Sequence, residues 1–292
     1  MGKLRCWLRD WPLPGAAVLT ALFVGLGLLI GNLPMPMTGG YVWLIAVEVL
    51  EVFWPLGLVL LCGYGWTYVR GGFFRTLRAG AVYLIMEGFL LAVTLAALVT
   101  GEAPNPVSWT YGAFLAAFAL GVGFREESLF RGVIVNLLAQ RYARSRAGIW
   151  GTVVASGAFF GLVHLGNVFA GINLSSALVQ SATAWALGCT MCAIYLRGGS
   201  LWALILLHGL TDAASMLYAA AFAGNDVLEA IDSLGVENLT PILPFTLLTV
   251  YLLRNSKCDE ILARFGETAL PDSLPEPPAY GASDGEETQH EV

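Results

Sequence analysis

Charged residues are scarce in this chain: Asp, Glu, Lys and Arg make up 12% of the 292 residues, whereas hydrophobic residues make up 57%. Soluble domains carry about a quarter charged residues and under half apolar ones. Such an apolar surplus cannot be buried inside one water-exposed globule, so lipid must solvate much of the surface. The composition excludes a single soluble domain and predicts an all-α, polytopic membrane protein.

The sequence also lacks a basic patch of the kind that binds nucleic acid, which excludes a nucleic-acid partner. Its five cysteines lie mostly inside apolar runs, and Cys189 and Cys192 form a single C-x-x-C without a second pair. We interpret these two cysteines as small packing residues rather than as a redox or zinc motif. The H-E-x-x-H helix of common metalloproteases is absent as well.

Eight apolar stretches are long enough to cross a bilayer as helices, which takes about 20 residues each. The first could instead be a cleaved signal peptide, but its apolar run is long and no A-x-A site follows it. The fourth continues as a predicted helix toward Gln140. The predicted spans are residues 14–31, 41–66, 79–99, 111–129, 149–165, 176–196, 201–221 and 240–253.

Lys and Arg alternate between the connections of these spans. They occur before the first span and after the second, fourth, sixth and eighth, whereas residues 32–40, 100–110, 166–175 and 222–239 contain none. Lys and Arg stay on the cytoplasmic side of short loops. The pattern therefore predicts a multi-pass protein of the cell (inner) membrane with both termini in the cytoplasm.

The domain organisation follows from this hydropathy pattern. Residues 1–255 are predicted to form one eight-helix transmembrane domain. Residues 256–292 carry several prolines and acidic residues and too little apolar surface to fold alone. We therefore predict a disordered, acidic cytoplasmic tail over residues 256–292.

Ionisable side chains at membrane depth cost several kcal/mol unless they face a partner or a cavity, so they mark functional sites. Glu127 and Arg131 in the fourth span are four residues apart and can pair on one helix face. Glu126 is rotated about 100° from Glu127 and can face another element. An alternative is that these residues form an interfacial charge cluster at the end of the helix.

Two of the three histidines lie inside predicted spans. His164 is a lone histidine in the fifth span, where a satisfied core residue is the alternative interpretation. In the seventh span, His208 and Asp212 lie four residues apart on one helix face. Two imidazoles and two carboxylates are the groups needed to activate a water molecule and to stabilise the oxyanion of a cleaved amide.

These residues follow the motif order E-E-x-x-x-R, F-x-x-x-H and H-x-x-x-N/D, each motif in its own span. The chain thereby resembles the CPBP family of intramembrane proteases (CAAX proteases and bacteriocin-processing, Abi-type proteins), and in particular type II CAAX prenyl proteases. The resemblance covers roughly residues 111–221, which we take as the protease-like core. The residues that carry it are Glu126, Glu127, Arg131, Phe160, His164, His208 and Asp212.

The resemblance implies a membrane-embedded endopeptidase, a hydrolase that cleaves a membrane-associated peptide or protein. Glu126 and His164 would deprotonate the attacking water, and His208 with Asp212 would stabilise the oxyanion or orient the water. Glu127 and Arg131 would support the site by locking the helix. The eukaryotic CAAX protease has Asn at the position of Asp212, and an ionised Asp cannot donate a hydrogen bond to an oxyanion.

Whether a metal takes part stays open at this point. Glu126, His164 and His208 would make a workable zinc set with an open fourth position. The resemblance instead favours a glutamate-type mechanism that requires no cofactor. Along the helix axis, His164 lies farther from the basic end of its span than His208 does, at about 1.5 Å per residue. Bringing the two together requires staggered helices or a later start of the fifth span.

Three further carboxylates, Glu48, Glu51 and Glu87, lie in the second and third spans without an obvious Lys or Arg partner at depth. They could be neutral, interfacial, or part of the same wet cavity. In a secondary transporter they would form a proton or substrate path, although no inverted repeat supports this function. The other alternative is a non-catalytic scaffold or immunity protein of the same fold.

Overall fold

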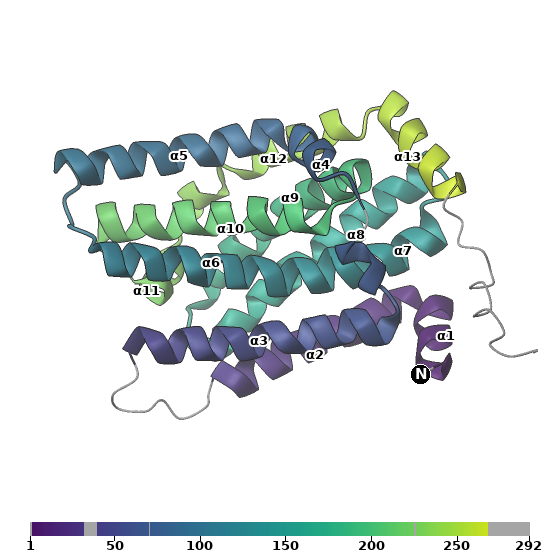
Figure 1. Ribbon diagram of the computed structural model, residues 1–292, viewed down its shortest axis with the longest axis horizontal. Coiled ribbons are helices and arrows are strands. Elements are labelled where there is room, and N and C mark those ends of the chain that lie inside the picture. Colours follow the sequence, from purple (N-terminus) through teal and green to yellow (C-terminus); the bar gives the residue numbers. More distant parts are fainter. Residues whose placement is uncertain (1, 32–39, 70, 225, 268–292) are drawn as a thin grey trace, which may run out of the picture.

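The computed structural model describes residues 2–31, 40–69, 71–224 and 226–267, and every regular element within these ranges is helical. Long helices lie side by side along one direction and form a bundle (Figure 1). The predicted all-α class is confirmed. The α-helices are α1 (Gly2–Asp10), α2 (Pro12–Gly31), α3 (Gly40–Cys62), α4 (Phe73–Ala79), α5 (Ala81–Thr100), α6 (Trp109–Leu129), α7 (Val135–Tyr142), α8 (Arg146–Leu165), α9 (Leu174–Gly198), α10 (Leu201–Tyr218), α11 (Val227–Asp232), α12 (Ile242–Leu252) and α13 (Asn255–Glu267).

Each of the eight predicted spans coincides with one of these helices, but their count as membrane spans is not confirmed. Among the described residues, six helices are long and apolar enough to cross a membrane, namely α2, α3, α5, α8, α9 and α10. A seventh is possible if Val236–Leu252 and Asn255–Ala263, which meet at 61°, form one broken span. The helix α6 is not among the six, because its last turns carry Arg125, Glu126 and Glu127.

The connections rich in arginine lie at one end of the bundle, where α1, α4 and α13 also lie (Figure 1). Arg5 donates to the carbonyl of Leu61 at the end of α3 at 2.8 Å. Arg75 of α4 donates to the carbonyl of Gly198, at the end of α9. These contacts place three basic segments together, as the alternation of charges predicts. Arg70 lies outside the described residues.

The prediction of a disordered tail from residue 256 is wrong for its first part, because α13 extends to Glu267. Its apolar residues recur with helical spacing, and this face packs against the bundle. Cys258 and Ile261 are both almost completely buried in one apolar cluster with residues of α8 and α9. Residues 268–292 lie outside the described residues.

The helix α6 continues through a π-helical turn, η2 (Phe130–Ile134), into α7, so the predicted continuation toward Gln140 is confirmed. The chain then reverses, and α8 begins at Arg146. Along the bundle, this start lies farther from His208 than the start of α10 does. As a result Phe160, on about the fourth turn of α8, meets His208, on about the second turn of α10. Their ring centroids lie 5.7 Å apart. The helices are therefore staggered, which answers the question of depth that the sequence leaves open.

Glycines allow α8 and α9 to approach closely. A Cβ atom on Gly157 would lie 2.5 Å from Sγ of Cys189, and one on Gly161 would lie 2.7 Å from the carbonyl oxygen of Ser181. This Gly-x-x-x-Gly is a packing site, as small residues at this spacing often are. At Gly27 and Gly31, which have the same spacing in α2, an added Cβ atom would meet no described atom within 4 Å, so no described contact requires glycine there.

Replacing Gly157 with Ala is expected to lower the free energy of unfolding by about 1–3 kcal/mol, because the new methyl group overpacks the contact with α9. Gly151, also in α8, has open space at its Cβ position, and its change to Ala is expected to stabilise the helix by up to about 1 kcal/mol. Thermal unfolding of both variants in detergent measures the difference. Equal shifts of the same sign would contradict the proposed close approach.

Candidate active site

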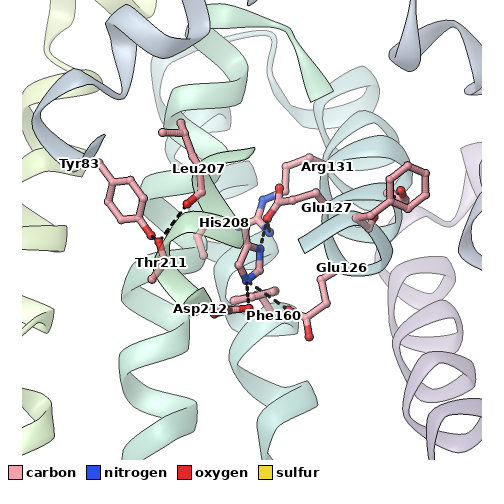
Figure 2. Close-up of polar contacts among 12 residues, drawn as sticks. Tyr83, Glu126, Glu127, Arg131, Phe160, Leu207, His208, Thr211 and Asp212 are labelled. Atoms are coloured by element: carbon pink, nitrogen blue, oxygen red, sulfur yellow. Dashed lines mark hydrogen bonds and ion pairs between the residues drawn. The ribbon is translucent and has the colours of Figure 1, made fainter. Parts of the chain in front are cut away.

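A buried network joins Glu127, Arg131 and His208 (Figure 2). Oε1 of Glu127 accepts a hydrogen bond from Nη1 of Arg131 at 2.8 Å and lies 2.8 Å from Nδ1 of His208. Glu127 and Arg131 have no exposed surface, and His208 is 3% exposed. Oε1 of Glu127 can therefore accept hydrogen bonds from both Nη1 of Arg131 and Nδ1–H of His208. The other ring nitrogen of His208, Nε2, is then free to serve a reacting group.

Arg131 connects three helices at this point. Its Nη2 donates to the carbonyl of Gly188 on α9 at 3.1 Å, and its guanidinium lies over the ring of Phe160 on α8, 4.8 Å from the centroid. Arg131 itself belongs to the π-helical turn that follows α6. Such turns often occur at functional sites. Arg131 therefore pairs with Glu127 at the predicted i, i+4 spacing. Its other contacts connect the end of α6 with α8 and α9.

Two carboxylates converge on Nε2 of His208. It lies 3.7 Å from Oε2 of Glu126 and 3.6 Å from Oδ2 of Asp212, as Figure 2 shows on the side of the ring opposite Glu127. Both distances are too long for direct hydrogen bonds, so an interaction between these groups would pass through an intervening water or substrate atom. Oε2 of Glu126 is buried and accepts no hydrogen bond from the described residues. The carboxylate oxygens of Glu126 and Asp212 therefore both lie near Nε2 of His208 without a direct hydrogen bond to it.

His164 occupies a neighbouring place on α8. Its Nδ1 lies 2.9 Å from the carbonyl oxygen of Phe160, to which it can donate, and its ring packs edge-on against the Phe160 ring with centroids 5.1 Å apart. The structure shows no hydrogen bond or ion pair from His164 to Glu126, His208 or Asp212 within the described chain. The structure thus brings Glu126, His208 and Asp212 together, whereas His164 packs against the same Phe160 ring as His208 without a hydrogen bond or ion pair to any of the three in the described chain.

The three candidate zinc ligands do not form a preorganised metal site. In the part of the chain that the structure describes, no group of three or more His, Cys, Asp or Glu side chains is arranged to hold a metal ion. His208 can donate Nδ1–H to Glu127 and His164 can donate its own Nδ1–H to the backbone of α8, which leaves Nε2 as the nitrogen of each ring that could bind a metal. Glu126, His164 and His208 are not gathered as one ligand set in the described chain, and we derive no step through a metal.

Comparison with known families identifies the segment that carries most of these residues. Residues 107–214 match the family model described as type II CAAX prenyl endopeptidase Rce1-like. This segment is an Rce1-like domain. The match confirms the resemblance inferred from the motifs and supports, at the level of the family, a CAAX protease-like intramembrane endopeptidase. No curated protein and no solved structure matches the chain.

The sequence motifs alone did not reveal two polar contacts around the Rce1-like domain. Tyr83 of α5 is completely buried, and its hydroxyl forms a hydrogen bond with Oγ1 of Thr211, the neighbour of Asp212. Thr211 in turn donates to the carbonyl of Leu207 (Figure 2). Tyr83 therefore ties α5 to the helix that carries His208 and Asp212. A single tyrosine in an apolar span gives no signal from which this contact could be predicted.

The second contact corrects the expectation that Glu48 and Glu51 lack a cationic partner. Arg125 of the Rce1-like domain forms ion pairs with both glutamates of α3, with its Nε 3.4 Å from Oε1 of Glu48. Arg125 precedes Glu126 by one residue and is rotated about 100° from it, so it faces α3 while Glu126 faces His208. Glu87 of α5 is buried, and no Lys or Arg of the described chain forms an ion pair with it.

Proposed function

We propose that the Rce1-like domain hydrolyses a peptide bond in a membrane-associated peptide or protein, with Glu126 as the general base. The observation that supports this function is the pair formed by Oε2 of Glu126 and Nε2 of His208, 3.7 Å apart. A water molecule between these atoms would donate one proton to the carboxylate. The site lies within a multi-pass membrane protein, and we propose the cell membrane as its location, with both termini in the cytoplasm.

In this scheme the water oxygen attacks the scissile carbonyl carbon as its proton passes to Glu126. The C–N bond then breaks, and the leaving amine takes the proton from Glu126, which returns the carboxylate to its starting state. His208, oriented by Glu127 through Nδ1, accepts a hydrogen bond from the water through Nε2 when neutral, and as the imidazolium it donates from Nε2 to the developing oxyanion. His164 contributes its remaining ring nitrogen to the substrate side of the site. The scheme needs no cofactor, since protein groups supply every proton transfer.

Asp212 lies against the same nitrogen, and its role depends on its protonation. An ionised Asp212 would repel an oxyanion, whereas a protonated one would donate a hydrogen bond to it. We therefore expect Asp212→Asn to keep activity within about tenfold of the parent, and Asp212→Ala to lose about 100-fold, because only the first retains a donor. Initial rates of peptide cleavage by the two variants test this. A greater loss in the Asn variant would assign Asp212 the role of a base.

Quantitative membrane proteomics tests the function itself. Cells that carry Glu126→Ala should accumulate uncleaved precursors that are processed in cells with the parent protein. Glu102→Gln removes a carboxylate from the exposed turn after α5 and is the matched control. If Glu126→Gln combined with His164→Ala restores the function of a deletion strain, the protein acts as a non-catalytic scaffold and the proposal is wrong.

A further inference from the structure

A small cavity of about 150 Å³ lies between α3 and α6, and neither Glu126 nor His208 is among its lining residues. Its walls are almost entirely apolar and come from Val49, Val52 and Phe53 on α3 and from Phe118 on α6. The one ionisable side chain in the lining is Glu48. The cavity has the size of one long side chain, which is too small for most independent ligands.

The carboxylate of Glu48 is held in the wall of this cavity by the approach of α6. Glu48 is 5% exposed, and its Oε1 accepts no hydrogen bond from any described residue. A Cβ atom at Gly121 would lie 2.5 Å from Cγ of Glu48. Glycine at position 121 is therefore what allows the glutamate side chain to lie against α6.

The charges around Glu48 do not balance. Arg125 is the single cation of the described chain that pairs with Glu48, and it also pairs with Glu51. When both carboxylates are ionised, one guanidinium facing them leaves one negative charge inside the bundle. A buried charge is costly unless it is paired, so a cation entering the cavity would find a partner in Glu48.

We propose that this cavity binds a Lys or Arg side chain of the substrate, an inference that rests on the proposed function. The apolar walls would contact the methylene groups of such a side chain, and Glu48 would pair with its charged end. Gly121 precedes Glu126 by five residues, or about 7.5 Å along the helix. An extended peptide covers this distance in two to three residues. The basic residue would therefore lie two or three positions from the scissile bond.

Binding measured without turnover tests this proposal separately from proteolysis. The probes are fluorescein-labelled apolar hexapeptides that differ at one position, which carries Lys, Arg, norleucine or Glu. They are titrated against the Glu126→Gln protein in detergent micelles and followed by fluorescence anisotropy. Peptides with Lys or Arg are expected to bind about tenfold more tightly than the norleucine peptide, because norleucine has a similar stem without the charge.

Two glutamates provide a matched comparison, because both pair with Arg125 but only Glu48 lines the cavity. Adding Glu48→Gln should abolish the preference for Lys and Arg, whereas adding Glu51→Gln should preserve it. Ala117→Leu, which fills the cavity without changing a charge, should weaken binding of the basic peptides as well. Retained preference in the Ala117→Leu variant would place the basic side chain elsewhere and overturn the proposal.

Three other results would overturn the inference. The first is equal binding of Lys and norleucine peptides, and the second is equal loss in the Glu48 and Glu51 variants, which would indicate an effect through Arg125. The third is tighter binding of norleucine, which would indicate an apolar or lipid occupant. Cleavage of the same peptides by the parent protein is scored independently. Selective binding without cleavage would contradict the proposed hydrolysis alone.

Discussion

Replacing Glu126 with Gln is expected to reduce peptide hydrolysis by about 10³-fold while leaving the fold intact. A positioned general base contributes about 10²–10⁴ to the rate, and the amide of Gln cannot take a proton from water. The substitution preserves the size of the side chain and removes only the charge. Because Oε2 of Glu126 accepts no hydrogen bond from the described residues, few contacts within the protein are lost.

Single-turnover cleavage assays with the purified protein in detergent measure this loss. Intrinsic tryptophan fluorescence during thermal unfolding shows whether the variant is folded. The Glu102→Gln variant controls for the loss of a carboxylate elsewhere. Cleavage by the Glu126→Gln variant within about threefold of the parent would remove Glu126 from the role of base and, with it, the proposed mechanism.

Arg131→Met is expected to destabilise the protein by about 3–5 kcal/mol, which is typical of breaking a buried ion pair. The side chain of Arg131 is fully buried, and its removal would leave the carboxylate of Glu127 inside the bundle without its cation. The bond to Gly188 and the contact with the Phe160 ring would be lost as well. Arg146→Met breaks the exposed ion pair with Asp259 instead, and it should barely change the unfolding temperature.

A double-mutant cycle separates the pair from its surroundings. Removing Glu127 together with Arg131, as Leu and Met, leaves no uncompensated charge, so the double variant should lose less stability than the two single changes summed. The double variant and the single Glu127→Leu variant also lose the acceptor for Nδ1 of His208. The activity of both should therefore fall. Additive losses of stability would show that Glu127 and Arg131 do not act as a unit.

Three carboxylates lie around His208, and the helix faces determine which neighbour each residue of the Arg125–Glu127 run contacts. Glu127 faces inward to Arg131 and Nδ1 of His208, Glu126 faces Nε2, and Arg125 faces α3. Three consecutive residues thus serve three different neighbours because each turns about 100° from the last. The Rce1-like match extends over this run and over His208 and Asp212, but not over Glu48 and Glu51, which lie on α3.

Much of the architecture could be predicted from the sequence. A segment of about 20 apolar residues has few alternatives to a spanning helix, and each predicted span coincides with a helix. Length and composition were less informative for α6, where functional charges lower the hydropathy of a helix that lies within the bundle. The helix α13 was missed, because the acidic composition of the tail masked a short apolar face that includes Cys258 and Ile261.

The amino-acid sequence by itself determined which residues are candidates for chemistry, since ionisable side chains are rare in lipid-solvated helices and persist there only with partners. Only the tertiary structure decided their partners. Glu127 and His208 lie 81 positions apart in the chain, and no local signal predicts their contact, which depends on how α6 and α10 are rotated and staggered. The same holds for Arg125 and for His164, whose neighbours are set by the packing of α3 and α8 against the rest of the bundle.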